Sequence, residues 1–390
     1  MEHIHIAAAA RSPIGKFGGG LKGIPIAELG AVIASAIVPE SAKHLIEEVI
    51  LGQVLQAGSG MNVSRQIALK VGIPNTVPAY TVNMACGSSL KAVALAATTL
   101  RETSAPLALA GGVEIMSAAP YLLPNLRWGQ KLGDSAAIDS IQNDGLTDPT
   151  LHIGMGETAE RIADILSISR EEQDAYAAES QARVQRHLEA FTREIVPVQT
   201  RHSMVQNDEH PRAETSVASL SKLRPVFRAD GSVTAGNASG INDGAAMVLL
   251  ATETGLRATG LHSRARVIAS ATTGCDPATM GLGPVTAIQS VLQRAGWTSD
   301  SVDLFEINEA FAAQALGCIR QLNLDPLRVN TRGGAIALGH PIGASGARIL
   351  VTLLHAMEDT DARRGIASLC IGGGMGIAVA IERSSILPHG

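Results

Sequence analysis

The chain has 390 residues, which predicts two or three domains, because a single hydrophobic core rarely grows beyond about 250–300 residues. Hydrophobic residues make up 46% of the chain, charged residues 17% and aromatic residues 3%, and 40 residues are glycine. This composition predicts a globular protein that packs small side chains and buries surface by self-association. The net charge of −5, without any block of Lys or Arg, argues against nucleic-acid binding.

The sequence also argues against a secreted or membrane-spanning protein. The N-terminal stretch MEHIHIAAAARS lacks the charged start and long apolar run of a signal peptide, and no apolar run approaches ~18 residues. The four cysteines, Cys86, Cys275, Cys318 and Cys370, form no CxxC pair, and their spacing fits neither a zinc site nor a disulfide framework. We therefore expect a cytoplasmic protein without a bound metal.

Apolar strands alternate with helices along most of the chain, which predicts an α/β fold. Strands are expected, in chain order, within residues 3–13, 47–58 and 106–117, then a strand leading into a helix within 301–319, then two strands joined at a glycine turn within 365–382. Between residues 117 and 240 the chain is more polar, and an amphipathic helix is expected over 167–191. Ser169 and Glu172 have the spacing of a capping box at its start. This middle block is therefore interpreted as an insertion.

Two parts of the chain resemble each other, which indicates an internal duplication. CGSSLKAVALAATTL precedes PLALAGG in the first part, and GASGARILVTLLHAM precedes IASLCIGG in the second. Each pair reads as a turn of small residues, a helix and an apolar strand that ends in glycines. Two similar domains are the simplest explanation.

Cys86 lies in VNMACGSSLKAV, just before a helix expected to start near Gly87. Unpaired N–H groups and the positive end of the helix dipole would face the thiol there, and both favour the thiolate. Ser88 and Ser89 leave room for a substrate to approach. The stretch fits a nucleophile, although most free cysteines are small buried hydrophobic residues.

His340 lies between Gly339 and Pro341 in a segment rich in glycine and alanine, ahead of a helix expected near Ala344. Pro341 restricts the backbone of His340 to extended conformations, so the ring is held on a rigid loop. An imidazole in this place can accept a proton from a thiol. A solvent-facing loop histidine is the alternative.

Two further segments place polar groups at strand ends. Cys370 ends an apolar strand, and the turn from Gly372 to Gly374 offers backbone N–H groups to an oxyanion. Asn308 ends another strand, where ligand crevices of α/β sheets are found. Read alone, Cys370 is a core cysteine and Asn308 a helix cap.

Taken together, the segments around Cys86, Asn308, His340 and Cys370 resemble those of the thiolase family, and the resemblance covers nearly the whole chain. AARSPIGKFGG, GNASGINDGAA, GLGPV and GGAIALGHPIGASGAR carry it as well. It implies a five-layered αβαβα fold of two duplicated α/β halves with an inserted loop domain. The implied domains are residues 1–116 with 241–262, the inserted residues 117–240, and residues 263–390.

The resemblance also implies a role for each site residue. Cys86 is the acylated nucleophile, His340 activates it and helps to bind the thioester oxygen, and Cys370 is the acid and base for the α-proton. Asn308 holds a water beside that oxygen, and the backbone N–H groups of Cys86 and Gly372 form a second oxyanion hole. The implied activity is the reversible condensation of two acetyl-CoA molecules to acetoacetyl-CoA and CoA, or cleavage of a 3-ketoacyl-CoA. Coenzyme A thioesters are the substrates, no cofactor is needed, and the subunits form dimers or tetramers.

The expected contacts with coenzyme A are less specific. Ser239 matches a pantetheine contact, Arg212 an arginine near the nucleotide, and four positions resemble pocket-lining residues: Phe227, Ala235, Ala310 and Phe311. Gly154 departs from thiolases specific for acetoacetyl-CoA, which often have histidine before the Met-Gly pair seen here at Met155. This departure leaves the acyl chain length open.

Alternative functions are a broader-chain 3-ketoacyl-CoA thiolase, a decarboxylating ketoacyl synthase of the same superfamily, and a non-catalytic acyl-CoA-binding relative. The synthases use one cysteine and two histidines, so Asn308 and Cys370 argue against them. A binding protein has no need for Cys86, His340 and Cys370 together. No GxGxxG opens a helix after the first strand and no GxSxG is present, which argues against a nucleotide-dependent dehydrogenase and a serine hydrolase of those types.

Overall fold

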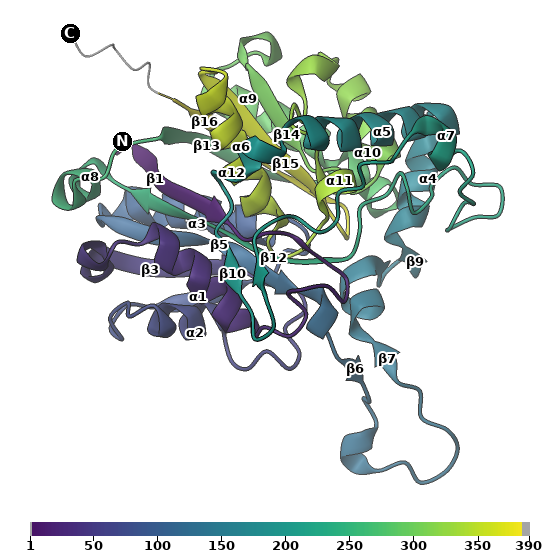
Figure 1. The fold of residues 1–390 in the computed structure, drawn as a ribbon, viewed down its shortest axis with the longest axis horizontal. Helices are drawn as coiled ribbons and strands as arrows, with labels where there is room; N and C mark the ends of the chain where they lie inside the picture. The colour runs from purple at the N-terminus through teal and green to yellow at the C-terminus, as the bar shows by residue number, and fades with distance from the viewer. Residues whose placement is uncertain (1, 384–390) are drawn as a thin grey trace.

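One mixed sheet runs through the molecule (Figure 1). The computed structural model describes residues 2–383. The strand order is β14-β15-β16-β13-β1-β12-β5-β3-β4, with β2 beside β12. The strands are β1 (Ile4–Arg11), β2 (Gly15–Lys16), β3 (Ile46–Gly52), β4 (Ala79–Val82), β5 (Leu107–Ile115), β12 (Asn242–Ala251), β13 (Ala265–Gly274), β14 (Leu304–Ile307), β15 (Arg364–Ile371) and β16 (Met375–Glu382).

The pairing pattern confirms the duplication. From the outside inward, β3 is parallel to β5 as β14 is to β15, and β5–β12–β1 are antiparallel as β15–β16–β13 are. The halves meet where β1 pairs antiparallel with β13 over three residue pairs, from Ile4 with Val267 to Ile6 with Ala265. The strands predicted from the sequence are confirmed, although β3 and β15 each begin one residue before the expected range, at Ile46 and Arg364.

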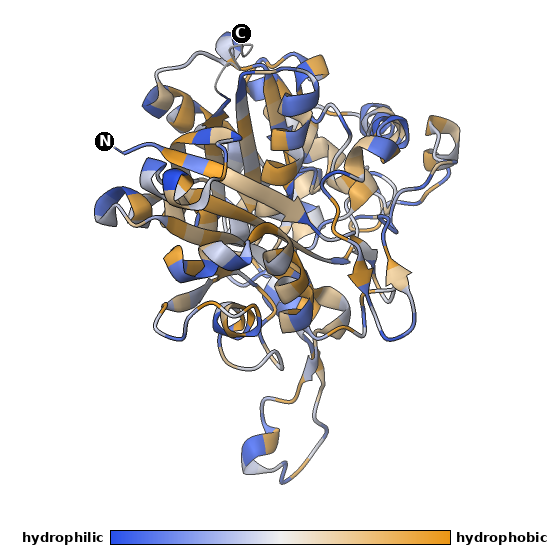
Figure 2. Ribbon diagram, turned by 60° about the vertical axis from the view of Figure 1, so that its left-hand side comes forward, coloured by the Kyte–Doolittle hydropathy of each residue, from blue (hydrophilic) through white to orange (hydrophobic). Residues whose placement is uncertain are grey.

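Helices cover both faces of each half-sheet and produce five layers. The outer helices of the first half are α1 (Ile26–Ile37) and α2 (Val63–Lys70), those of the second half are α9 (Gly283–Ala295) and α10 (Ala312–Gln321), and the central pair is α3 (Ser88–Thr103) and α12 (Ser345–Asp359). The central core joins α3 and α12 to both half-sheets, and two outer cores lie beneath the outer helices. Figure 2 shows hydrophobic residues concentrated in the central strands.

Successive side chains along each strand point to opposite faces of the sheet, and both sets are apolar, so helices can cover both faces. In β5, Ala108 and Ala110 face the central core, while Leu107 and Leu109 face the outer one. Small residues toward the centre let the paired helices approach the sheet closely. None of the helices within residues 2–383 is long and apolar enough to cross a lipid bilayer.

The segment between β5 and β12 adds no strand to the main sheet, as expected for an insertion. It contains α4 (Met155–Ile165), α5 (Arg170–Arg186), α6 (Leu188–Phe191), α7 (Val217–Leu220) and three small antiparallel pairs: β6 (Tyr121–Leu122) with β7 (Ile138–Asp139), β8 (Thr147–Asp148) with β9 (Ile153–Gly154), and β10 (Val198–Gln199) with β11 (Met204–Val205). A wide helical turn spans Ile141–Leu146. The domain boundaries given above stay a prediction, and residues 384–390 of the last domain lie outside the described part.

The predicted capping box of α5 is confirmed, but the helix is shorter than expected. The N–H of Glu172 donates to Oγ of Ser169 at 3.2 Å, and the Ser169 N–H donates to the Glu172 carboxylate at 2.8 Å. The helix ends at Arg186, because His187 leaves helical backbone angles and its Nδ1 bonds to the carbonyl of Arg183 at 2.8 Å. The apolar pattern that extended the prediction belongs to the separate turn α6.

A buried ionic cluster attaches the insertion to the first half. The guanidinium of Arg11, fully buried at the end of β1, donates to Glu194 at 2.5 Å and forms two hydrogen bonds with Asp208 at 2.6 and 2.9 Å. The ring of Phe191 lies 5.3 Å from the guanidinium carbon. Removing one charge would leave the others buried without compensation.

A long loop between β6 and β7 projects away from the body (Figure 1). It exposes large apolar side chains, including Trp128 at 85% and Leu132 at 92% of their surface. Exposed apolar groups gathered in one segment are typical of a contact with another protein surface.

Candidate active site

Cys86, His340 and Cys370 line one cavity of about 310 Å³ between the two halves and the insertion. Cys86 comes from the first half, and His340 and Cys370 from the second. The walls are mostly apolar. The other lining residues are Met116, Gln142, Gly145, Leu146, Gly154, Met155, Gly156, Val226, Phe227, Thr234, Ala235, Ala238, Ser239, Gly240, Ile241, Met280, Ala310, Phe311 and Ile342.

Cys86 lies in a tight turn between β4 and α3. The residue before it, Ala85, has φ +41°, which is uncommon for alanine and turns the chain sharply. Ser88 stabilises this turn, because its Oγ donates to the Ala85 carbonyl at 2.6 Å and accepts the N–H of Met84 at 2.9 Å. Gly87 is the N-cap of α3, so the expected start of the helix is confirmed.

The protonation state of Cys86 differs from the expectation. Burial raises the pKa of the Cys86 thiol to about 11, and the negative charge of Glu114 acts in the same direction. The backbone N–H groups of Gly372 and of Cys86 itself lower this pKa, but they do not outweigh burial. The resting sulfur is therefore a neutral thiol that needs a base to remove its proton.

The loop that carries His340 is fixed by residues from the other half. The side chain of Asn242, at the start of β12, accepts the N–H of His340 at 3.0 Å and donates to the carbonyl of Gly15 at 3.0 Å. Gly339 has φ +106°, and a Cβ on it would lie 2.4 Å from Cγ of Asn242. Only glycine fits this backbone and this close contact.

Farther along this loop, Gly343 reaches β5. A Cβ on Gly112 of β5 would lie 2.2 Å from the carbonyl oxygen of Gly343, which explains the glycine within this strand. The buried carboxylate of Glu114 accepts the N–H of Gly343 at 2.9 Å and those of Val54 and Leu55 at 2.9 and 3.2 Å. Burial raises the pKa of Glu114 to about 7, although these three donors oppose the shift.

The imidazole of His340 can act as a base. Burial and the positive charge of Arg348 lower its pKa to about 3, so the ring is neutral near neutral pH. Nδ1 lies 2.6 Å from Oγ of Ser345, and that hydroxyl donates to the carbonyl of Pro341 at 2.8 Å. Nδ1 must therefore carry the hydrogen, which leaves Nε2 as the acceptor.

Cys370 is fully buried at the end of β15, beside the turn from Gly372 to Gly374 that leads into β16. Burial raises the pKa of its thiol well above the usual value, and the neighbouring charge of Cys86 raises it further. The two thiolates therefore disfavour each other. Gly372 does not line the cavity itself, but its N–H reaches the Cys86 sulfur.

Asn308 lies directly behind His340. It is 1% exposed, and its Nδ2 is 3.5 Å from both ring nitrogens of His340. The backbone is fixed because the Asn308 N–H donates to the carbonyl of Ser368 at 2.9 Å. The amide is thus next to the ring without lining the cavity, and its contact with a water stays a prediction.

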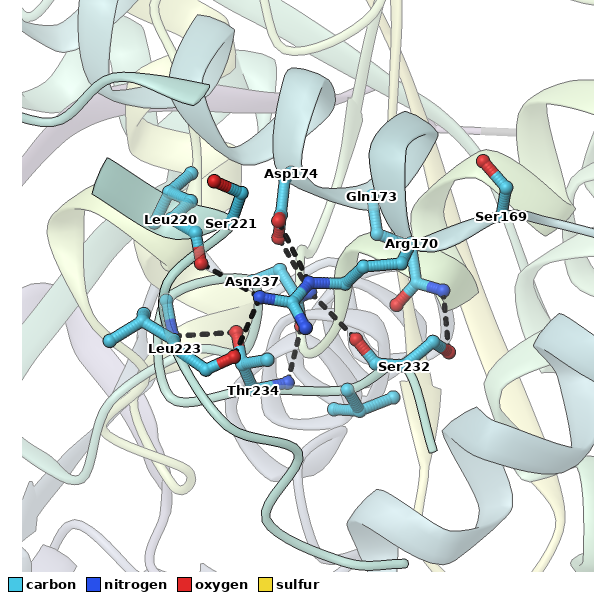
Figure 3. Close-up of polar contacts among 12 residues, drawn as sticks. Ser169, Arg170, Gln173, Asp174, Leu220, Ser221, Leu223, Ser232, Thr234 and Asn237 are labelled. Carbon is cyan, nitrogen blue, oxygen red and sulfur yellow. Dashed lines mark hydrogen bonds and ion pairs between the residues drawn. The ribbon is translucent and has the colours of Figure 1, made fainter. Parts of the chain in front are cut away.

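Polar contacts at the start of α5 fix the loops of the insertion that lie near the cavity (Figure 3). Arg170 pairs with Asp174 at 2.8 Å and donates to the carbonyls of Leu220 and Leu223 at 2.7 and 2.9 Å. The amide of Asn237 donates to the other oxygen of Asp174 at 3.0 Å. The buried face of α5 is largely polar because it forms these bonds.

Five of the six residues expected to contact coenzyme A line the cavity: Phe227, Ala235, Ser239, Ala310 and Phe311. The rings of Phe227 and Phe311 meet edge to face with centroids 6.2 Å apart, and the N–H of Ser239 donates to the carbonyl of Ala310 at 3.0 Å. Arg212 is exposed and does not line the cavity, so its contact with the nucleotide stays a prediction.

Sequence reasoning missed Asn242, Ser345, Glu114 and Arg348, all of which fix the position or charge of the site. Their local sequences contain no sign of the role, because each acts on a residue that is distant in the chain or hidden behind the loop. The glycines at 112 and 343 were the available indication that β5 and the His340 loop touch.

Comparisons with known proteins assign the family. Residues 4–254 match the model of the thiolase N-terminal domain, and residues 261–383 match that of the thiolase C-terminal domain. The chain belongs to the thiolase family. An acetyl-CoA acetyltransferase of Pseudomonas aeruginosa is 50% identical over 98% of this chain and 100% of that protein.

Solved thiolase structures have the same fold. An acetyl-CoA acetyltransferase of Bacillus anthracis superposes with a TM-score of 0.94 at 42% identity, covering 98% of this chain and 99% of the other. Human mitochondrial 3-ketoacyl-CoA thiolase in complex with CoA superposes with a TM-score of 0.95 at 40% identity, covering 98% of each chain. The predicted five-layered fold is confirmed, and these full-length relatives support an acyltransferase of the thiolase type.

Proposed function

We propose that this thiolase catalyses the reversible condensation of two acetyl-CoA molecules to acetoacetyl-CoA and CoA, through an acetyl group on Cys86. The observation that carries the proposal is the shared cavity, which is lined by two cysteines from opposite halves and by one neutral histidine. Acyl transfer needs a nucleophile, and carbon–carbon bond formation needs a separate group for the α-proton.

In the first half-reaction, Nε2 of His340 takes the proton of the Cys86 thiol. The sulfur attacks the thioester carbonyl of acetyl-CoA, and the N–H groups of Cys86 and Gly372 stabilise the negative oxygen. The CoA thiolate then leaves and takes a proton, and an acetyl thioester remains on Cys86. Because the acetyl group passes from one thiol to another, the free-energy change of this step is close to zero.

In the second half-reaction, the Cys370 thiol gives its proton to Nε2 of His340, and the resulting thiolate removes an α-proton from another acetyl-CoA. The carbanion attacks the acetyl group on Cys86, and the Cys86 thiolate leaves as acetoacetyl-CoA forms. Acetylation helps this step, because it keeps Cys86 uncharged while Cys370 is ionised, so the two thiolates, which disfavour each other, do not form together. In cleavage, the Cys370 thiol returns its proton to the departing carbon.

His340 and Asn308 are proposed to stabilise the charge on the second thioester oxygen, the amide through a bound water. Coenzyme A thioesters serve as substrates, and no separate cofactor or metal is needed for these steps. The apolar wall that includes Phe227 and Ala235 suits a pantetheine arm.

Cleavage of acetoacetyl-CoA tests the proposed function. Wild-type protein with free CoA should release acetyl-CoA, and the Cys86→Ala variant should release none above the background without enzyme. Full turnover by Cys86→Ala would refute the assignment, and wild-type protein that binds CoA without turnover would indicate a binding relative.

A second candidate is a thiolase for longer 3-ketoacyl chains, and the space at Gly154 favours it. Gly154 lines the cavity with φ −70° and ψ 153°, a conformation that other residues adopt. A Cβ there would meet only the carbonyl oxygen of Leu146 at 4.0 Å, so a side chain would extend into open space. The missing side chain leaves room beside the acyl group.

A panel of 3-ketoacyl-CoA chain lengths decides between the candidates. If Gly154 opens the pocket, wild-type protein cleaves chains longer than four carbons, and Gly154→Leu loses these while it retains acetoacetyl-CoA. Gly23→Leu, at an exposed position with no atom near its Cβ, is the matched control. A sharp loss of wild-type activity beyond four carbons would refute the longer-chain candidate.

We also propose self-association as a dimer or tetramer in the cytoplasm. The loop with Trp128 and Leu132 exposes apolar surface, and β4 pairs only with β3 within residues 2–383, so its other edge can pair with another subunit. The four cysteines are free thiols, as suits a reducing compartment. Analytical ultracentrifugation tests the assembly, and a monomer at micromolar concentration would contradict it.

A further inference from the structure

Arg348 is a buried cation beside the proposed active site whose role the mechanism above does not include. It lies in the first turn of α12 and is 1% exposed. Its Nη2 donates to Oδ1 of Asn308 at 3.4 Å, while Nε and Nη1 have no hydrogen-bond partner among residues 2–383. A buried guanidinium with so few partners is costly, and a purely structural site would satisfy it better.

The charge of Arg348 is also incompletely matched. The carboxylate of Glu306 lies 4.0 Å from Nη1, beyond hydrogen-bond distance. Burial raises the pKa of Glu306 to about 8, so this carboxyl does not need the cation in order to be buried. The bond to Asn308 is the one hydrogen bond of the Arg348 side chain within the described residues.

The contact settles which way the amide of Asn308 points. A guanidinium carries only hydrogen-bond donors. The part of the Asn308 amide that faces it must therefore be the carbonyl oxygen, which accepts. With Oδ1 held by Arg348, Nδ2 faces His340, where it lies 3.5 Å from both ring nitrogens. If the amide were flipped, Nδ2 of Asn308 would face the N–H donors of Arg348, and Oδ1 would lie beside the imidazole.

We propose that Arg348 is a positioning residue that holds Asn308 with its N–H donors toward His340. The inference rests on the proposed function, in which those donors hold a water against the thioester oxygen. Arg348 thus acts on the steps that pass through the carbanion. It is not part of the oxyanion hole for the acetylation of Cys86, which is made by the N–H groups of Cys86 and Gly372, and loss of its charge would only make His340 a stronger base.

A double-mutant cycle tests this assignment. Arg348→Met should lower kcat for acetoacetyl-CoA cleavage by about tenfold or more, the effect expected from one misplaced donor. In an Asn308→Ala background the same substitution should cost little, because the amide it positions is gone. Equal losses in both backgrounds, or full activity of Arg348→Met, would overturn the proposal.

Partial reactions separate positioning from a structural role. Arg348→Met should still be acetylated on Cys86 by acetyl-CoA at close to the wild-type rate, while exchange of the α-protons of acetyl-CoA falls with kcat. A parallel loss of both reactions would mean that the site has collapsed and would refute the proposal. Wild-type protein that cleaves no acetoacetyl-CoA would instead refute the proposed function.

Two more variants complete the design. Arg348→Lys keeps a donor and a charge in the core, so it should recover part of the lost activity and serves in the cycle if Arg348→Met does not fold. Arg332→Met is the matched control, since Arg332 is equally buried in the same half but bonds to Asp359 and the carbonyl of His355. It should lower the melting temperature and leave kcat per folded molecule unchanged.

Discussion

The hydroxyl of Ser345 lies 2.6 Å from Nδ1 of His340 and donates its own hydrogen to the carbonyl of Pro341. This pair of bonds fixes the hydrogen of the imidazole on Nδ1 and directs the lone pair of Nε2 away from the loop. A base for the Cys86 thiol is thereby prepared before substrate arrives.

Ser345→Ala should lower kcat by about tenfold, because one buried hydrogen bond contributes on the order of 1 kcal/mol and its loss lets the ring change tautomer. Steady-state kinetics with acetoacetyl-CoA measures the effect, with KM expected to change little. Ser64→Ala removes another buried hydroxyl, which accepts the N–H of Leu51, and should leave kcat intact. An unchanged kcat in Ser345→Ala would show that the hydroxyl does not hold the ring.

Alkylation of Cys86 should keep accelerating as the pH rises. The thiolate is the reacting form, and burial raises the pKa of Cys86 to about 11, so the thiolate fraction grows by about tenfold per pH unit below that value. The rate with iodoacetamide from pH 6 to pH 10 measures this, and Cys86→Ala gives the background from Cys275. A plateau near pH 7 would mean that the thiol is already ionised at neutral pH.

Cys370→Ala should separate the two half-reactions. The variant should accept an acetyl group from acetyl-CoA on Cys86, because the groups for that step are intact. It should neither condense two acetyl-CoA molecules nor exchange their α-protons with solvent, since the buried acid and base is gone. Normal condensation by Cys370→Ala would exclude the proton-transfer role.

Arg11→Met should destabilise the protein by about 3–5 kcal/mol, because Glu194 and Asp208 would stay buried without their partner. Urea unfolding followed by circular dichroism measures this loss. Arg186→Met is the control, since its pair with Glu179 is exposed and contributes at most about 1 kcal/mol. Equal midpoints for both variants would show that the buried cluster does not attach the insertion.

The site residues that could be predicted from the sequence are those whose neighbours in the chain indicate their place in the fold. Cys86, His340 and Cys370 each lie among glycines and small residues at the end of a strand or the start of a helix, and those features locate them in the fold. The strand ends converge because the duplicated halves face each other, which the repeated turn–helix–strand pattern already indicated.

The features that could not be predicted from the sequence depend on contacts between segments that are far apart in the chain. The helix position of Cys86 suggested an ionised thiol, but burial by both halves raises its pKa, and no local pattern reports that burial. Arg348 looks like a solvent-facing helix residue until α12 is packed against β14. His187 ends α5 early through a bond to Arg183, although the apolar residues after it continue the helical pattern.

Trapping the acyl-enzyme tests the central claim most directly. Wild-type protein is incubated with acetyl-CoA labelled in its acetyl group, quenched in acid and digested, and the labelled peptide is identified by mass spectrometry. The account predicts one acetyl group on the peptide that contains Cys86, discharged by added CoA. Label on another residue, or an unlabelled protein that still cleaves acetoacetyl-CoA, would contradict it.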